Sequence, residues 1–194
     1  MSVLGYTPLL KPTVATGVTF DPLSLGTGTT LSGGNLTASK ASGANGVARC
    51  TVGKSTGKWY AEFSIDSGTL GSHVIGLVTA ANDPNQQLGD TVESWAYFGS
   101  VAGSGYKRHF PGAFTLYGTT YTTGDIMGIA LDMTGGQVTV YKNNTSQGVM
   151  FTSLTGTLYM AVHGYAALAA VITAKFAQSS WTYSAPSGFV ELTP

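Results

Sequence analysis

The sequence predicts an all-β fold, an antiparallel β-sandwich, from three observations. Runs rich in Val, Ile, Thr and aromatic residues recur roughly every 10 to 15 residues from Val47 onward, and Gly, Asn or Pro fills almost every gap between them. No apolar pattern keeps a helical period for more than a couple of turns. Charged residues make up only 9% of the chain, whereas Gly, Ser and Thr are abundant. Many short strands without helices are typical of two packed antiparallel sheets.

The chain is expected to divide into an extended N-terminal arm and one sandwich domain. Residues 1–20 contain prolines that interrupt strand pairing, so they are predicted to form an arm or linker. Residues 21–194 form the predicted domain, with a core of about 47–190. Residues 21–46, rich in Gly, Ser and Thr, are either edge strands of that domain or a loosely packed lead-in to it.

The core contains a series of segments with the composition of strands. In the segment 58–65, Trp59, Phe63 and Ile65 face one side of the strand. Glu62 lies on the other side, and such alternation fits a sheet with one buried face. The predicted strands are 47–52, 58–65, 73–80, 94–98, 113–117, 125–132, 137–142, 148–151, 158–164, 169–176 and 181–184.

The stretch 124–154 gives the strongest hairpin signal. Gly135 and Gly136 separate two β-branched runs, and glycine tolerates the positive φ that two-residue turns need. A hairpin with a tight glycine turn at Thr134, Gly135 and Gly136 is therefore predicted. Asn143 and Asn144 are predicted to shape the next turn, because asparagine is also tolerant of positive φ.

Five segments, in order, resemble the motifs of SPRY domains. The resemblance covers roughly 47–190 and implies a concanavalin-like sandwich that binds other molecules. It departs from the family mildly at Asn144, where the family usually has glycine. The segments are GKWYAE at 57–62, IGL at 75–77, GDIMGIALD at 124–132, VTVYKNN at 138–144, and the closing residues Phe176, Trp181, Tyr183 and 186–189.

A second resemblance lies in the N-terminal arm. The segment LGYTP, Leu4 to Pro8, is similar to a segment that recurs in bacteriophage tail-fibre and baseplate-associated proteins. Together with the charge-poor composition, it implies a virion protein of the phage tail that is made in the host cytoplasm. Fibre modules are commonly trimers, so the resemblance also implies a homo-oligomer, a trimer.

The acidic residues are predicted to be structural, and no catalytic residue is assigned. Asp125 and Asp132 stand at strand ends, where a carboxylate accepts backbone N–H bonds in turns. A catalytic or calcium-binding pair is the alternative for these two. Glu62 and Asp66 nominally share one face of a strand, as a glycosidase pair would, but the supporting acid of the sandwich glycosidases is missing.

Composition and spacing also argue against metals, cofactors, nucleic acid and membranes. The three histidines stand far apart with no second ligand at metal spacing, so no metal site and no cofactor is expected. Nine basic residues balance nine acidic residues, which leaves no electrostatic footprint for nucleic acid. No stretch of 18 apolar residues exists, so membrane insertion is not expected.

Binding is expected in two loops at the ends of the sandwich, because loops on a rigid scaffold carry recognition. The loop 99–112 gathers aromatic and basic residues in a chain otherwise short of charge, and the loop 82–94 is polar and acidic. A solvated loop or a trimer contact is the alternative. Trp95 is either a core anchor or a sugar-stacking residue. The candidate binding residues are Tyr106, Lys107, Arg108, His109, Phe110, Asp83 and Trp95.

These observations predict a non-enzymatic binding module of a phage virion. Its partner would be a bacterial surface glycan or protein receptor, or other virion tail proteins, with weak sites on several copies acting together. The first alternative is an intracellular peptide-binding SPRY adaptor domain, which predicts a monomer. The second alternative is a polysaccharide-cleaving sandwich enzyme, which predicts a carboxylate pair facing a groove.

Overall fold

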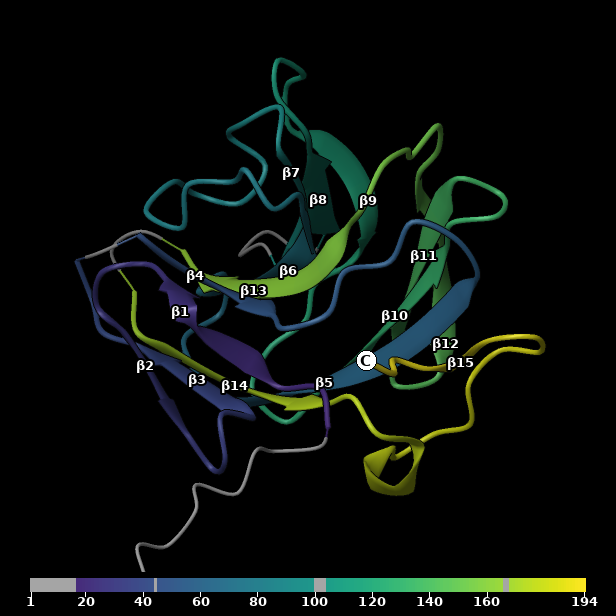
Figure 1. Cartoon of the computed structure of the whole chain (residues 1–194). Coiled ribbons are helices and arrows are strands. Elements are labelled where there is room, and N and C mark those ends of the chain that lie inside the picture. The colour runs from purple at the N-terminus through teal and green to yellow at the C-terminus, as the bar shows by residue number, and fades with distance from the viewer. Residues whose placement is uncertain (1–16, 44, 100–103, 166–167) are drawn as a thin grey trace, which may run out of the picture.

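The computed structural model describes residues 17–43, 45–99, 104–165 and 168–194, and within them it is the predicted sandwich of two sheets (Figure 1). In this part of the chain, sheet A has the order β1-β4-β13-β6-β7-β8-β9 and sheet B the order β12-β11-β10-β5-β14-β3-β2. Neighbouring strands within each order are antiparallel. A two-residue strand, β15, pairs in parallel with β5 at Trp59 and Tyr60.

The strands are short, as the composition predicts. Sheet A contains β1 (Phe20–Leu25), β4 (Gly46–Cys50), β13 (Tyr159–Gly164), β6 (His73–Val78), β7 (Ser94–Phe98), β8 (Ser104–Arg108) and β9 (Thr115–Thr119). Sheet B contains β12 (Thr145–Phe151), β11 (Gln137–Lys142), β10 (Ile126–Asp132), β5 (Lys58–Gly68), β14 (Ala170–Lys175), β3 (Thr37–Lys40) and β2 (Thr29–Ser32), with β15 (Val190–Glu191). One short 3-10 helix, η1, spans Gln178–Ser180.

The core lies between the two sheets and begins earlier in the chain than the predicted core. Phe20, Phe63 and Phe176 are fully buried there, with ring centroids 5.6 Å apart for Phe20–Phe176 and 5.9 Å apart for Phe63–Phe176. Val18 also joins this core. The segment left open between edge strands and a lead-in contributes β1 to sheet A and β2 and β3 to sheet B. Residues 1–16, with the LGYTP segment, lie outside the described residues.

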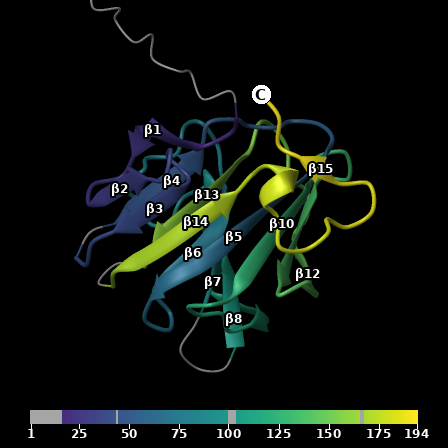
Figure 2. The same cartoon turned by 90° about the horizontal axis from the view of Figure 1, so that it is seen from below.

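The predicted hairpin is confirmed by the antiparallel pairing of β10 and β11, but its turn is longer than predicted and one predicted strand is wrong. The connection between β10 and β11 is four residues long, because Asp132 pairs with Gln137, and only Gly136 of the two glycines has positive φ, 62°. The predicted strand 181–184 is irregular backbone. That segment crosses the outer face of sheet B, where its amides bond to a side chain rather than to a neighbouring strand (Figure 2).

The outer face of β5 is consequently buried, although the alternation predicted a solvated face for Glu62. The Glu62 carboxylate accepts hydrogen bonds from the backbone N–H groups of Thr182 and Tyr183 at 2.5 and 2.9 Å. The Tyr60 ring packs edge-on against Trp181, with centroids 4.9 Å apart. The segment 177–189, here called the C-terminal strap, therefore covers the part of sheet B that the local sequence pattern left exposed.

Among the described residues, no helix is long and apolar enough to cross a membrane.

Candidate functional site

A shallow apolar groove lies at one end of sheet A, and we call it the aromatic groove. Its volume is about 240 Å³. It is formed where β6, β7 and β13 meet the connections that follow or precede them, and most of its lining is aromatic or aliphatic carbon. The lining residues are Leu70, Gly71, Phe98, Tyr106, Phe114, Tyr165 and Leu168.

The strand register explains why residues so far apart in sequence meet at this end. His73 at the start of β6 pairs with Gly164 at the end of β13, and Val74 pairs with Phe98 at the end of β7. The turn before β6 and the residue after β13 therefore lie at the same end of these strands. Phe98 in turn pairs with Tyr106 on β8, which extends the groove sideways.

The groove has a buried floor and exposed walls. Phe98 is only 5% exposed, whereas Phe114 is 44% exposed and Leu70 and Tyr165 are each 39% exposed. Phe98 packs edge-on against both exposed rings, with centroids 5.0 Å from Phe114 and 6.0 Å from Tyr165. Such edge-to-face contacts fix the ring orientations before any partner arrives.

Two polar contacts hold the walls in place. The Tyr165 amide donates to the Ser72 carbonyl at 2.7 Å, which ties the end of β13 to the turn before β6. The Arg108 guanidinium lies over the Phe114 ring, 4.7 Å from its centroid, and forms an ion pair with Asp90. A cation held over an aromatic face both stabilises the ring and places charge at the rim.

The structure divides the candidate binding residues instead of gathering them on one loop. Tyr106, Lys107 and Arg108 lie on β8, so the predicted loop 99–112 contains a strand that the sequence pattern missed. Tyr106 lines the groove and Arg108 reaches its rim through Phe114. Lys107 projects elsewhere, and its ammonium donates to the Met150 carbonyl at 2.6 Å.

The remaining candidates lie away from the groove. His109 stacks on Trp95 with ring centroids 4.4 Å apart and planes within 7°, so one face of the Trp95 indole is covered. Phe110 follows β8 and is exposed. Asp83 lies in the β6–β7 connection, at the opposite end of those strands, where its carboxylate accepts the Asn85 amide at 2.9 Å. That hydrogen bond lowers the pKa of Asp83.

The sequence reasoning missed most of the groove lining, namely Leu70, Phe98, Phe114, Tyr165 and Leu168. Each is an apolar residue at a strand end or turn, and any of them could equally have been a core residue. The available signal was an aromatic placed next to glycine at a strand end, as in Phe98-Gly99 and Gly164-Tyr165. This pattern identifies groove residues only when the strand register shows that the ends of β7 and β13 both lie beside the start of β6.

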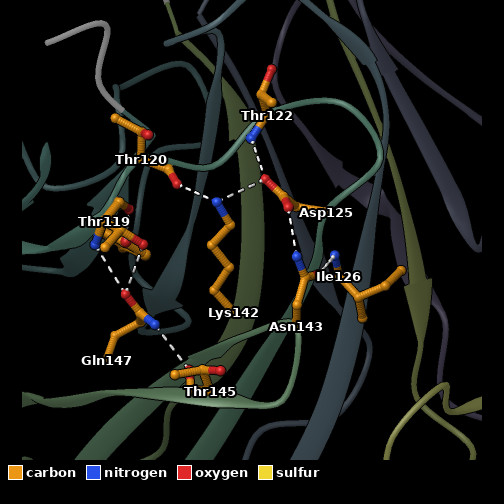
Figure 3. A network of polar contacts seen from close by, with 10 residues as sticks. Thr119, Thr120, Thr122, Asp125, Ile126, Lys142, Asn143, Thr145 and Gln147 are labelled. Atoms are coloured by element: carbon orange, nitrogen blue, oxygen red, sulfur yellow. Dashed lines mark hydrogen bonds and ion pairs between the residues drawn. The ribbon is translucent and has the colours of Figure 1, made fainter. Parts of the chain in front are cut away.

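The acidic residues hold turns, as predicted. Asp125 accepts the Thr122 amide at 2.8 Å and the Asn143 side-chain amide at 2.7 Å, and it pairs with the Lys142 ammonium at 3.2 Å (Figure 3). Asp132 accepts the Gly135 amide at 2.7 Å and pairs with Lys58. These partners occupy both carboxylates.

Glu62 and Asp66 do not form a pair facing a groove. Glu62 is fully buried beneath the C-terminal strap, and Asp66 accepts a hydrogen bond from the Thr173 hydroxyl. A sugar could not reach the Glu62 carboxylate without displacement of the strap. In the described part of the chain, no group of three or more His, Cys, Asp or Glu side chains is placed to hold a metal ion.

Two histidines, His73 and His163, are buried. His73 has its Nε2 atom 2.8 Å from the Ser67 carbonyl oxygen, and burial lowers the pKa of this histidine. Burial, and to a smaller extent the charge of Lys40, lowers the pKa of His163 to about 3. Both imidazoles are therefore neutral at physiological pH, and they belong to the interior rather than to a catalytic site.

Comparison with protein families and curated proteins agrees with the motif order. The family model "SPRY domain" matches residues 58–175. Ran-binding protein 9 of Xenopus laevis is 33% identical over 128 residues, which are 66% of this chain and 23% of that protein. The E3 ubiquitin-protein ligase RKP of Arabidopsis thaliana is 29% identical over 100 residues, 50% of this chain and 7% of that protein. The chain thus spans less than a quarter of the length of these relatives.

A solved structure shows the same fold. The SPRY domain of human HERC1 superposes with a TM-score of 0.68 at 20% sequence identity, covering 80% of this chain and 96% of that domain. At that identity the likeness establishes the architecture only. The curated relatives named here are eukaryotic, and they favour the SPRY adaptor alternative over the phage-tail role, which these comparisons do not support.

Proposed function

We propose, from the fact that this chain belongs to the SPRY domain family, that it binds a protein partner through the aromatic groove. SPRY domains are generally non-catalytic protein-interaction modules. The partner proposed for this chain is a short peptide segment that inserts apolar side chains between Tyr106, Phe114 and Tyr165.

The observation that carries the proposal is the exposure of large apolar side chains around a pre-ordered hollow. Exposed apolar residues scattered singly need no explanation, but a contiguous group around a concavity marks an interaction site. Phe114, Leu70 and Tyr165 all border one groove. Aromatic side chains and arginine are also the residue types that dominate binding energy at interfaces.

The size and chemistry of the groove favour a peptide over a sugar. A volume of about 240 Å³ is below the range of roughly 300–1,000 Å³ usual for small-molecule sites, so it suits one or two anchoring side chains. Sugar recognition needs several converging hydrogen-bond partners. Here the Arg108 guanidinium at the rim is already paired with Asp90.

Selection from a displayed random-peptide library tests this proposal, followed by calorimetric titration of the selected peptides. Phe114→Ala and Tyr106→Ala should each weaken binding by about tenfold or more, because they remove groove walls. The matched control is Leu23→Ala on β1, since Leu23 is 95% exposed and lies on the opposite edge strand of sheet A. Peptides that bind the wild type and both groove variants equally would contradict the proposal.

The phage-tail role and the trimer remain predictions that rest on the Leu4–Pro8 segment. The oligomeric state of the chain distinguishes these two predictions from the adaptor role. Size-exclusion chromatography with light scattering should give a trimer if the chain is a fibre module and a monomer if it is an adaptor. Virion location would then be tested by antibody labelling of phage particles.

A further inference from the structure

Two residues of the aromatic groove, Tyr165 and Leu168, lie in the connection between β13 of sheet A and β14 of sheet B. Tyr165 is the first residue after β13, and Leu168 lies two residues before β14. Tyr165 follows a strand of sheet A and Leu168 precedes a strand of sheet B, and contacts from both sheets act on these two residues.

Sheet A holds one end of this connection through the backbone. The Tyr165 amide donates to the Ser72 carbonyl at 2.7 Å, and the Leu168 amide donates to the Tyr165 carbonyl at 2.9 Å. The first of these bonds ties Tyr165 to the turn before β6, which carries Leu70 and Gly71.

Sheet B holds the other end through a lysine side chain. Lys40, the last residue of β3, donates from its ammonium to the Leu168 carbonyl at 3.0 Å. Lys40 is only 5% exposed, and burial lowers the pKa of its ammonium. The donor in this hydrogen bond is charged, and such bonds are stronger than those between neutral groups.

The path of the Lys40 side chain is built into the fold. Lys40 pairs with Ala170 across β3 and β14, and its carbon stem passes over Gly164 at the end of β13. A Cβ atom at position 164 would lie 2.4 Å from the Lys40 Cδ atom, so the stem has room only because residue 164 is glycine. Thr29, His163 and Ile172 line the small enclosed space beside the stem.

We propose that Lys40 is a positioning residue for the aromatic groove. Lys40 does not itself line the groove, but its bond to the Leu168 carbonyl fixes the wall formed by Leu168 and Tyr165. The affinity of the groove for its peptide partner therefore depends on a buried residue of the opposite sheet. This inference rests on the proposed function for its effect on affinity, whereas its effect on the wall can be measured without a ligand.

The test replaces Lys40 by methionine, which keeps an unbranched apolar stem and removes the ammonium group. Amide hydrogen exchange by NMR should speed up at Tyr165 and Leu168 while the exchange of core amides in β5 and β10 is unchanged. The affinity for peptides selected against the wild-type groove should fall by about tenfold, within the range found for residues that act on a site without touching the ligand.

The matched control is Lys142→Met on β11. The Lys142 ammonium also donates to a backbone carbonyl, that of Thr120 at 2.6 Å, and it pairs with Asp125, but Lys142 does not line the groove. A general loss of stability would affect both variants alike, so a loss of affinity confined to Lys40→Met supports positioning. If Lys40→Met does not fold, Lys40→Gln replaces it, because glutamine retains an N–H donor on a shorter stem and should give an intermediate effect.

Two results would overturn the inference. One is a folded Lys40→Met protein with wild-type peptide affinity and wild-type exchange at Tyr165 and Leu168. The other is an affinity loss of the same size in Lys142→Met. Should Tyr106→Ala leave peptide binding intact, the groove is not the binding site, and the exchange measurement alone then decides whether Lys40 fixes the wall.

Discussion

Single residues in this chain carry structural tasks that their residue types only partly reveal. Glu62 has the residue type and strand position of a catalytic acid, but it binds two backbone amides of the C-terminal strap. Asn144 stands where SPRY domains usually have glycine, and its φ of 67° shows why glycine is usual there. In both cases the backbone geometry around the residue, rather than its reactivity, explains why it is present.

Replacing Glu62 by Gln should release the strap. Hydrogen bonds to a charged group contribute roughly 1.5–3 kcal/mol each, and the amide keeps only one acceptor oxygen for two donors. We expect the free energy of unfolding in urea to fall by about 2 kcal/mol and hydrogen exchange to rise at Thr182 and Tyr183. Asp83→Asn is the control, because Asp83 is a surface turn residue whose acceptor oxygen is preserved. Unchanged exchange at Thr182 and Tyr183 in Glu62→Gln would contradict the role assigned to the carboxylate.

The turn at Asn143 and Asn144 makes a complementary prediction. Both residues have positive φ, 46° and 67°, in the two-residue connection between β11 and β12. Asn144→Gly should leave stability unchanged or raise it slightly, whereas Asn144→Val should cost about 1–2 kcal/mol, since a β-branched residue is strained in this region. Thermal unfolding of the two variants side by side measures the difference, and equal melting temperatures would argue against strain at this position.

At the scale of elements, the strands with alternating or β-branched patterns were predictable and β8 was not. The boundaries of β7 and β11 coincide with the predicted ones, because Ser94–Phe98 and Gln137–Lys142 have strand composition throughout. The β8 sequence, SGYKR, contains glycine and two basic residues, which favour a loop by local preference. Pairing with β7 and β9 on both sides overrides that preference.

The glycine in β8 that weakened the strand prediction is required by packing. A Cβ atom at Gly105 would lie 2.4 Å from the Tyr97 ring and 2.6 Å from the Tyr117 carbonyl oxygen. Gly105→Ala should therefore push β8 from its place and destabilise the domain by about 1–3 kcal/mol, as overpacking does. Gly17→Ala is the matched control, because a Cβ atom there meets nothing within 4 Å. Equal unfolding midpoints in urea for the two variants would show that β8 is not tightly seated.

At the scale of the whole molecule, the architecture was predictable and the site was not. Fold class follows from many weak strand signals that agree, so an error in one element leaves the sandwich intact. The groove depends on the register of β6 with β13 and β7, strands far apart in the sequence. This register brings Leu70, Phe98 and Tyr165 to the same end of sheet A. Of the seven candidate binding residues, only Tyr106 lines it, because a loop prediction from composition cannot show which strand ends coincide.

The two buried histidines give the molecule a stability that depends on pH. A histidine whose pKa is lowered by folding binds fewer protons in the folded state than in the unfolded state. Its contribution is complete above the unfolded pKa of about 6.5 and is lost progressively as the pH falls below that value. His73 and His163 both have lowered pKa values, so both act in this direction. For His163, whose folded pKa is about 3, the loss at pH 5 amounts to about 2 kcal/mol.

Urea unfolding between pH 7.5 and pH 4.5 should therefore show falling stability from about pH 6.5 downward. His163→Leu should flatten this slope without loss at pH 7.5, because among the described residues neither ring nitrogen of His163 has a hydrogen-bond partner to lose. Asp132→Asn provides a contrast in the pH range over which a titrating group affects stability. Burial acts to raise the pKa of Asp132, but the hydrogen bond from the Gly135 amide and the Lys58 ammonium together lower it. The contribution of Asp132 is therefore present above about pH 3.9 and is lost only below it. A wild-type stability that stays constant from pH 7.5 to pH 4.5 would show that the two histidines are not held neutral in the interior.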